Sequence, residues 1–213
     1  MRWLRAVPFT ASYAALLIVL QAAVATLDHD TRSEVVREAS TNLTNLGNGH
    51  VETLLVSAFI QAEPALPRLL LVIAALAVAE LVLGWRRTLV VFVVGHVGAT
   101  LAVVAALAAG ALPGVVAAKV RDAADTGPSY GTAAVIGAGL LVATVRAFHR
   151  QGRRRAVRAT LTGLALVGVV VVTAGTLAVQ PTFTAWGHLI ALLGGAATGA
   201  VLLPYEPTAR VPA

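Results

Sequence analysis

Six apolar stretches separated by short polar segments dominate the hydrophobic pattern of this 213-residue chain. Each is long enough to cross a hydrocarbon core of about 30 Å, which takes about 20 helical residues. None alternates apolar and polar positions as a membrane β-strand does, whereas a helix satisfies every backbone group in lipid. The pattern therefore predicts an all-α polytopic membrane protein, a single domain over residues 1–213, with helices at 9–27, 66–84, 88–112, 131–148, 159–180 and 186–203.

The composition fits this interpretation, because 58% of the residues are hydrophobic and only 12% are charged. Lipid must cover most of such a chain, so membrane lipids are its first predicted partners. Cysteine is absent, which excludes disulfides, thiolate nucleophiles and cysteine metal sites. The net charge of +6 does not predict a nucleic-acid partner, because the basic residues border apolar segments. No cofactor and no metal site are predicted. The ratio of fifteen arginines to one lysine is typical of proteins encoded by bacterial genomes of high GC content.

The basic residues also predict an orientation, since cytoplasmic loops retain Lys and Arg. Eleven of the sixteen fall on the side of the N-terminus, including the run from Arg150 to Arg158. We expect a multi-pass protein of the cell membrane with both termini cytoplasmic and the long segment 28–65 outside. A cleaved signal peptide is the alternative for the first stretch, because Met1 to Arg5 is basic and residues 23–25 have a small-x-small form. The apolar run that reaches Leu27 favours a retained helix.

The outer segment 28–65 contains two further patterns. Thr31 and Glu34 have the spacing of a capping box, which predicts a short surface helix beginning there. Residues 51–60 are apolar but too few to span a membrane, so we expect them to be interfacial or re-entrant. Pro64 and Pro67 then reset the chain before the second long helix.

A serine and a histidine are predicted to lie at one depth. In the orientation above, the fourth and sixth helices run inward, so Ser129 and His188 both lie at outer helix ends. Histidine is the side chain best suited to activate a serine near neutral pH. After His188, small residues recur every four positions at Ala191, Gly195 and Gly199, a pattern that permits close helix packing.

These residues resemble the rhomboid family of intramembrane proteins. The family's proteases carry Gly-x-Ser-Gly at the fourth helix and Ala-His-x-x-Gly-x-x-x-Gly on the sixth. Here the corresponding residues are Gly127-Pro-Ser129, and Gly187-His188 followed by Ala191 and Gly195, while residues 54–61 resemble the family's Leu-Leu-Thr-Ser-x-Phe-x-His stretch. The resemblance implies a six-transmembrane-helix rhomboid-like bundle. It also implies an intramembrane serine endopeptidase, a hydrolase in which Ser129 attacks a peptide bond of a transmembrane substrate and His188 is the general base.

The sequence departs from the protease pattern at several positions. Tyr130 follows the serine where proteases have glycine, and Gln61 stands where the family often has His. Proteases hold the oxyanion with a His and an Asn four residues apart on the second helix, but the best match here begins at Arg68 and supplies neither. Losing one such donor costs about 10² to 10³ in rate. The alternative is therefore a rhomboid pseudoprotease that binds membrane clients, with Gly127, Tyr130, Arg68 and Gln61 as candidate binding residues. A small transporter is a third class, without the broken helices that would support it.

Three other polar residues have simpler interpretations. We expect Glu80 to reach Arg86 or Arg87, and His96 to pack deep in its helix against a backbone carbonyl, away from Ser129. Asp125 is a candidate third member of a Ser129–His188 triad, although an outer-loop aspartate is more often solvated.

Overall fold

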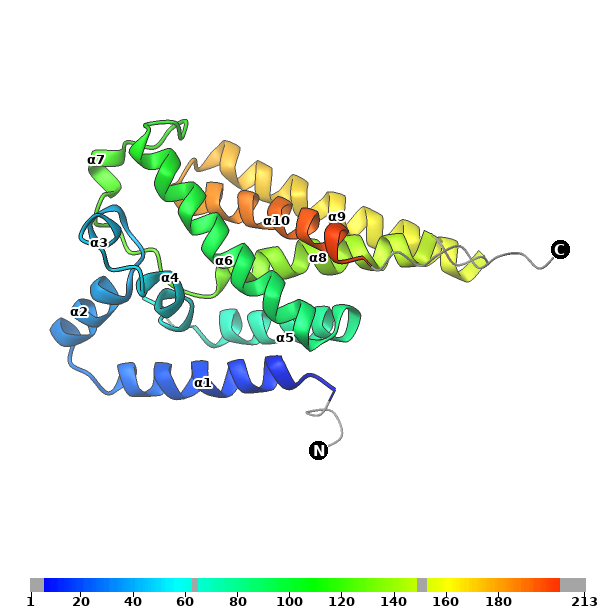
Figure 1. Ribbon diagram of the computed structural model, residues 1–213, viewed down its shortest axis with the longest axis horizontal. Coiled ribbons are helices and arrows are strands. Elements are labelled where there is room, and N and C mark those ends of the chain that lie inside the picture. Colours follow the sequence, from blue (N-terminus) through cyan, green and yellow to red (C-terminus); the bar gives the residue numbers. More distant parts are fainter. Residues whose placement is uncertain (1–5, 63–64, 149–152, 204–213) are drawn as a thin grey trace.

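The computed structural model describes residues 6–62, 65–148 and 153–203, without the side chains of 153–156, 158 and 159. The basic N-terminal residues 1–5 and residues 150–152, which contribute to the predicted orientation, lie outside the described residues, and of the arginines from 153 to 158 only the backbone is described. Within the described ranges the chain forms helices and no strand (Figure 1). Six of the helices are long and apolar enough to cross a membrane: α1 (Pro8–Ala25), α5 (Leu66–Leu83), α6 (Trp85–Ala108), α8 (Ser129–Phe148), α9 (Arg153–Val179) and α10 (Phe183–Leu202).

The all-α prediction and the six predicted spans are confirmed, but five of the six helices begin earlier than expected, α9 by six residues and α10 by three. α6 opens at Trp85 rather than 88, directly after Gly84, whose φ of 82° reverses the chain between α5 and α6. α8 opens at Ser129 rather than 131, so the predicted serine is the first residue of its helix. Hydropathy places the apolar centre of a span well and its ends poorly, because polar residues continue a helix without changing its geometry.

Small residues hold α8 and α10 in close contact. Gly187, Gly195 and Gly199 on α10 face α8, and a Cβ atom built on Gly195 would lie 2.0 Å from the carbonyl oxygen of Ala134. A Cβ on Gly199 would lie 2.9 Å from the Cα of Ala138. The predicted four-residue stripe thus packs against residues of α8 that share its spacing. α8 also contacts α5, α6 and α9, which makes it the central helix of the bundle.

Glu80 attaches α1 to the bundle. This carboxylate is buried on α5 and accepts hydrogen bonds from the backbone N of Phe9 (2.9 Å), the backbone N of Thr10 (2.7 Å) and Thr10 Oγ1 (2.6 Å). The expectation that Glu80 reaches Arg86 or Arg87 is wrong. The first turn of a helix has free N–H groups and a positive dipole end, so a buried carboxylate finds several donors there at once.

Short helices cover one end of the bundle, which we call the loop end (left in Figure 1). They are α2 (His29–Ala39), α3 (Leu43–Gly47), α4 (Thr53–Val56), the 3-10 turn η1 (Ser57–Phe59) and α7 (Ala117–Val120). α2 begins earlier than the predicted Thr31 box, because Asp28 caps it by accepting from the backbone N of Asp30 and Thr31. Residues 51–60 form short turns rather than a span, with Val51 and Leu55 exposed and Ser57 buried.

Candidate functional site

The turn before α8 is fastened to the loop segment 53–60. Gly127 has a φ of 103°, a conformation that favours glycine, and its backbone N donates to the carbonyl oxygen of Ser57 at 2.6 Å. Pro128 then contributes the first helical carbonyl, which accepts from the backbone N of Thr132 at 2.9 Å. The side chain of Gln61 lies beside this turn, since a Cβ on Gly127 would be 3.8 Å from its Cγ. Two predicted binding residues, Gly127 and Gln61, are therefore neighbours.

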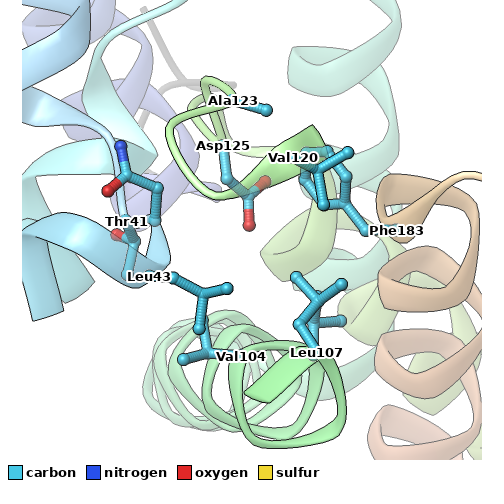
Figure 2. A pocket seen from close by; sticks show the side chains of 10 residues that line it. Thr41, Leu43, Val104, Leu107, Val120, Ala123, Asp125 and Phe183 are labelled. Carbon is cyan, nitrogen blue, oxygen red and sulfur yellow. The ribbon is translucent and has the colours of Figure 1, made fainter. Parts of the chain in front are cut away.

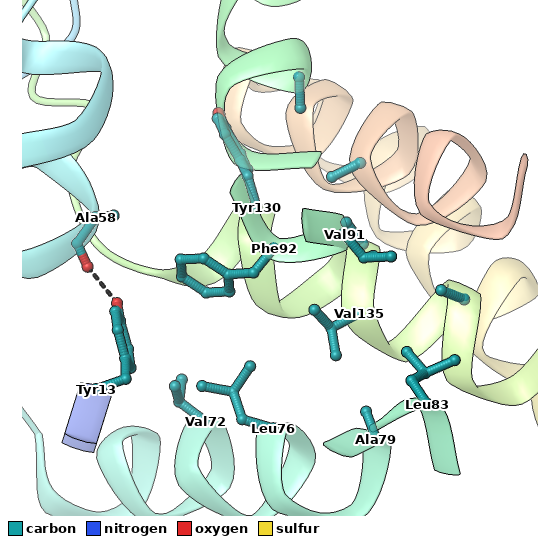
Figure 3. Packing of buried hydrophobic residues seen from close by; sticks show 14 of the residues in the cluster. Tyr13, Ala58, Val72, Leu76, Ala79, Leu83, Val91, Phe92, Tyr130 and Val135 are labelled. Carbon is teal, nitrogen blue, oxygen red and sulfur yellow. Dashed lines mark hydrogen bonds between the residues drawn. The ribbon is translucent and has the colours of Figure 1, made fainter. Parts of the chain in front are cut away.

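Tyr130 lies between two histidines in the middle of the bundle. Its ring centroid is 5.3 Å from that of His188 in an edge-on arrangement and 6.3 Å from that of His96. Gly187 makes room for the ring, because a Cβ there would lie 2.2 Å from Tyr130 Cζ. Phe92 and Tyr13 continue the aromatic cluster toward α1, where the Tyr13 hydroxyl donates to the carbonyl oxygen of Ala58 (Figure 3).

Ser129 and His188 occupy the first two turns of their helices, and both are partly buried. Within the part of the chain that the structure describes, no hydrogen bond joins Ser129 to His188, and the aromatic neighbour of His188 is Tyr130. Arg68 is exposed near the start of α5, with no hydrogen bond to either residue. The predicted residues Tyr130 and His188 are thus brought together, while Arg68 stands apart from them.

A second serine and histidine form a hydrogen-bonded pair that the sequence did not reveal. Ser57 Oγ lies 3.1 Å from His96 Nε2, and Thr41 Oγ1 lies 3.0 Å from the same Ser57 oxygen. Thr41 in turn donates to the carbonyl oxygen of Thr53 at 2.6 Å. Ser57 and His96 are 1% and 3% exposed, so this pair has no access to solvent. The arrangement joins the loop end to α6 by a chain of hydroxyl groups.

The expectation that His96 is packed inside the protein is met, but its expected backbone-carbonyl partner is wrong. Its Nε2 pairs with a side-chain hydroxyl rather than a backbone carbonyl, and its ring lies beside Tyr130, next in sequence to Ser129. The reason is the path of the loop before α8. This loop passes beside Ser57, since the backbone N of Gly127 donates to the Ser57 carbonyl oxygen before the helix begins. Counting residues along α6 alone cannot predict the path of this loop.

Asp125 belongs to the same loop before α8. Its backbone N donates to Ser40 Oγ at 2.7 Å, and its carbonyl oxygen accepts from the backbone N of Thr41 at 3.2 Å. Burial raises the pKa of the Asp125 carboxyl to about 7, and the Tyr130 hydroxyl partly opposes this rise. Asp125 makes no hydrogen bond to His188 in the described structure. The side chain that acts on the Asp125 carboxyl is Tyr130 rather than His188. Ser129, His188 and Asp125 therefore do not form a connected triad.

The site contains no metal-binding geometry, since no three His, Asp or Glu side chains gather together within residues 6–62, 65–148 and 153–203. Its chemistry is that of one partly buried serine, two histidines separated by a tyrosine, and one carboxyl group of raised pKa.

Comparison with known families gives one match. The sequence matches the profile described as rhomboid-like protein over residues 2–204, nearly the whole chain. No curated protein and no solved structure matches.

Proposed function

Because the chain belongs to the rhomboid-like protein family, we propose that this multi-pass membrane protein binds the transmembrane segments of other proteins without cutting them. The observation that carries the proposal is the position of Tyr130. Its ring packs against His188, the residue that a catalytic serine would need as its base. A serine hydroxyl is a weak nucleophile at its own pKa and depends on a base within hydrogen-bond reach.

The second helix supports the same conclusion. A peptide-cleaving serine site stabilises a developing oxyanion with aimed donors, each contributing about 10² to 10³ in rate. On α5, Arg68 is exposed, and the residue four positions later is Val72, which has no side-chain donor. The absence of both the base contact and these donors supports a binding role rather than peptide cleavage.

One observation favours a second candidate, an intramembrane serine protease. Ser129 directly precedes Tyr130, and the two share the first turn of α8 beside His188. In that function the Ser129 hydroxyl would attack the scissile carbonyl, with its proton passing to His188 and then to the leaving amine. The Tyr130 ring would have to leave the face of His188 for this transfer.

A labelling experiment separates the two functions. The protein is reconstituted in liposomes and exposed to a fluorophosphonate probe and to a synthetic transmembrane substrate, in parallel with Ser129→Ala and His188→Ala. Ser33→Ala is the matched control, because Ser33 is exposed on α2 and far from the bundle core. We expect no labelling and no cleavage by any form. Labelling and cleavage that Ser129→Ala and His188→Ala both abolish, and that Ser33→Ala retains, would overturn the proposal in favour of the protease.

Client binding needs its own measurement. Energy transfer between the labelled protein and a fluorescent synthetic transmembrane peptide in nanodiscs should show saturable association, with an unlabelled copy of the peptide as competitor. Absence of saturable binding would refute the proposed function.

We also propose that the loop end faces the outside of the cell membrane and that both termini are cytoplasmic. The chain has no cysteine, so single cysteines can be introduced without background. Asn48→Cys at the loop end and Trp85→Cys at the opposite end are both at exposed positions. A membrane-impermeant maleimide should label the first in intact cells and the second only after lysis, and the reverse pattern would invert the orientation.

A further inference from the structure

Three arginines and a tryptophan surround the turn between α5 and α6, at the end of the bundle opposite the loop end (Figure 1). We call Trp85, Arg86, Arg87 and Arg146 the turn cluster. The Arg86 guanidinium lies over the Trp85 ring, 5.1 Å from its centroid, and Arg146 Nη1 donates to the carbonyl oxygen of Val82 at 2.5 Å. Trp85 and Arg86 are exposed, and Arg87 is half-buried. The cluster therefore presents several positive charges at the surface of the bundle.

No acid neutralises this charge within the part of the chain that the structure describes. The ion pairs found there are confined to α2 and to the segment before α4. Glu80 on the neighbouring α5 is already bound to the first turn of α1. The remaining described acids belong to the loop end, among them Asp125, whose side chain lies between Thr41 and Val120 (Figure 2). The turn cluster thus has no described counter-charge of its own.

The turn cluster continues directly into the lipid-facing side of α6. Leu89 follows Trp85 by four residues and Arg86 by three, and Val93 follows Leu89 by four, so these side chains share one side of the helix. Leu89 and Val93 are each 37% exposed. Aromatic and basic residues at the end of an apolar span are typical of the level where hydrocarbon gives way to lipid headgroups. A lipid whose chain lay along Leu89 and Val93 would place its phosphate beside Arg86.

The chemistry of the cluster favours an anionic lipid over a zwitterionic one. Arg86 and Arg87 make no hydrogen bond to any described residue, so their N–H donors are available. The planar fork of a guanidinium matches two oxygens of a phosphate group. A zwitterionic lipid would bring a positive group together with its phosphate, and the cluster has no acid to pair with it. An anionic lipid brings the phosphate without that unpaired charge.

We propose that the turn cluster binds the headgroup phosphate of an anionic phospholipid, with Arg86 and Arg87 as the main donors and one acyl chain along Leu89 and Val93. Arg146 adds positive charge from α8 while it holds the end of α5. One bound lipid would then be shared by helices from different parts of the chain. The inference goes beyond client binding and does not depend on it, because it concerns the lipid around the bundle rather than a transmembrane segment.

The test titrates the full-length protein in detergent with phosphatidylglycerol or phosphatidylcholine of the same acyl chains and counts bound lipids by native mass spectrometry. The variants are Arg86→Gln and Arg87→Gln, singly and together, and Arg86→Lys, which retains the charge but loses the planar fork. Arg37→Gln is the matched control, because Arg37 is an exposed arginine at the loop end and its replacement changes the net charge equally. A further arm adds glycerophosphoglycerol, which is the same headgroup without chains.

We expect the first phosphatidylglycerol to bind the unaltered protein about tenfold or more tightly than the first phosphatidylcholine, since each basic residue at an anionic lipid surface contributes about fivefold. Each glutamine variant should lower this preference about fivefold, and the double variant should abolish it. Arg86→Lys should fall between Arg86→Gln and the unaltered protein, and Arg37→Gln should retain the full preference.

Three results would overturn the lipid site. The first is equal affinity of the unaltered protein for the two lipids, or a preference that survives the double variant. The second is an equal loss in Arg37→Gln, which would reduce the effect to net charge. The third is displacement of the bound lipid by an equal concentration of glycerophosphoglycerol, because the cluster would then recognise a soluble phosphate diester rather than a lipid.

Discussion

The contact between α8 and α10 predicts a large difference between two adjacent glycines. A Cβ on Gly195 would lie 2.0 Å from the carbonyl oxygen of Ala134 and 2.4 Å from its Cα, whereas a Cβ on Gly194 would meet nothing within 4 Å. Carbon atoms in good contact are about 3.5–4.0 Å apart, so Gly195→Ala must push the two helix backbones apart by more than about 1 Å. Backbone atoms cannot change rotamer, and the displacement therefore spreads along the whole contact.

The size of the effect follows from comparing the two variants with each other. Both gain the same helix propensity, about 1 kcal/mol for Gly→Ala, so this gain cancels. The remaining difference is the cost of overpacking, about 1–3 kcal/mol, and we expect Gly195→Ala at the upper end of that range because the clash is with backbone. Gly199→Ala should fall between the other two variants, since its Cβ would lie 2.9 Å from the Cα of Ala138.

The assay is equilibrium unfolding in mixed micelles with increasing SDS, followed by tryptophan fluorescence. Trp186 on α10 is a suitable reporter, because its indole N donates to the carbonyl oxygen of Pro113 at 3.4 Å and that contact is lost when α10 separates. The expected order of stability is Gly194→Ala, then Gly199→Ala, then Gly195→Ala. Equal midpoints for Gly194→Ala and Gly195→Ala would refute the close approach of the two helices.

Three further predictions concern polar groups. Glu80→Ala should lower the free energy of unfolding by about 3 kcal/mol or more, because it leaves buried donors of α1 without an acceptor, whereas Glu34→Ala at an exposed position should change it by less than about 0.5 kcal/mol in the same SDS titration. Ser57→Ala should increase amide hydrogen exchange of residues 40–60 while leaving that of α9 unchanged, and unaltered exchange in the loop would show that the hydroxyl chain does not fasten it. Because burial raises the Asp125 pKa from 3.8 to about 7 in the folded protein, the stability that its protonated form contributes is complete below pH 3.8 and is lost as the pH rises through 7. Unfolding at pH 5 and pH 8 should therefore show Asp125→Asn gaining on the unaltered protein at the higher pH, by a few kcal/mol at most at about 1.4 kcal/mol per pKa unit, and a gain confined to pH 5 would contradict the burial of this carboxyl group.

The features that sequence alone predicted are those with a local physical cause. A span of about 20 apolar residues must be a helix in lipid, and small residues at four-residue spacing must lie on one helix face. Both inferences need only neighbouring residues, and the contact of Gly195 with Ala134 agrees with the second. The family resemblance likewise depended on short motifs around Ser129 and His188, and the match over residues 2–204 confirms it.

The features that escaped prediction depend on partners far apart in the chain. Ser57 and His96 are 39 residues apart, and nothing near either residue indicates the other. The position at which α8 begins depends on the path of the loop before it. That path is determined by the hydrogen bond from Gly127 to Ser57 rather than by the composition of the loop. Which residue of the Ser129–Tyr130 pair faces His188 depends on helix rotation, and one residue corresponds to about 100° of that rotation.

The position of Glu80 has a consequence for the order in which the protein is assembled. α1 is synthesised first among the spans, but the carboxylate that binds Phe9 and Thr10 lies about 70 residues further along the chain. The first span must therefore enter the bilayer and remain there without its acceptor until α5 has been made. Docking of α1 is then a late step of biogenesis, and a ribosome-bound chain that ends before residue 80 should hold its first span loosely in lipid.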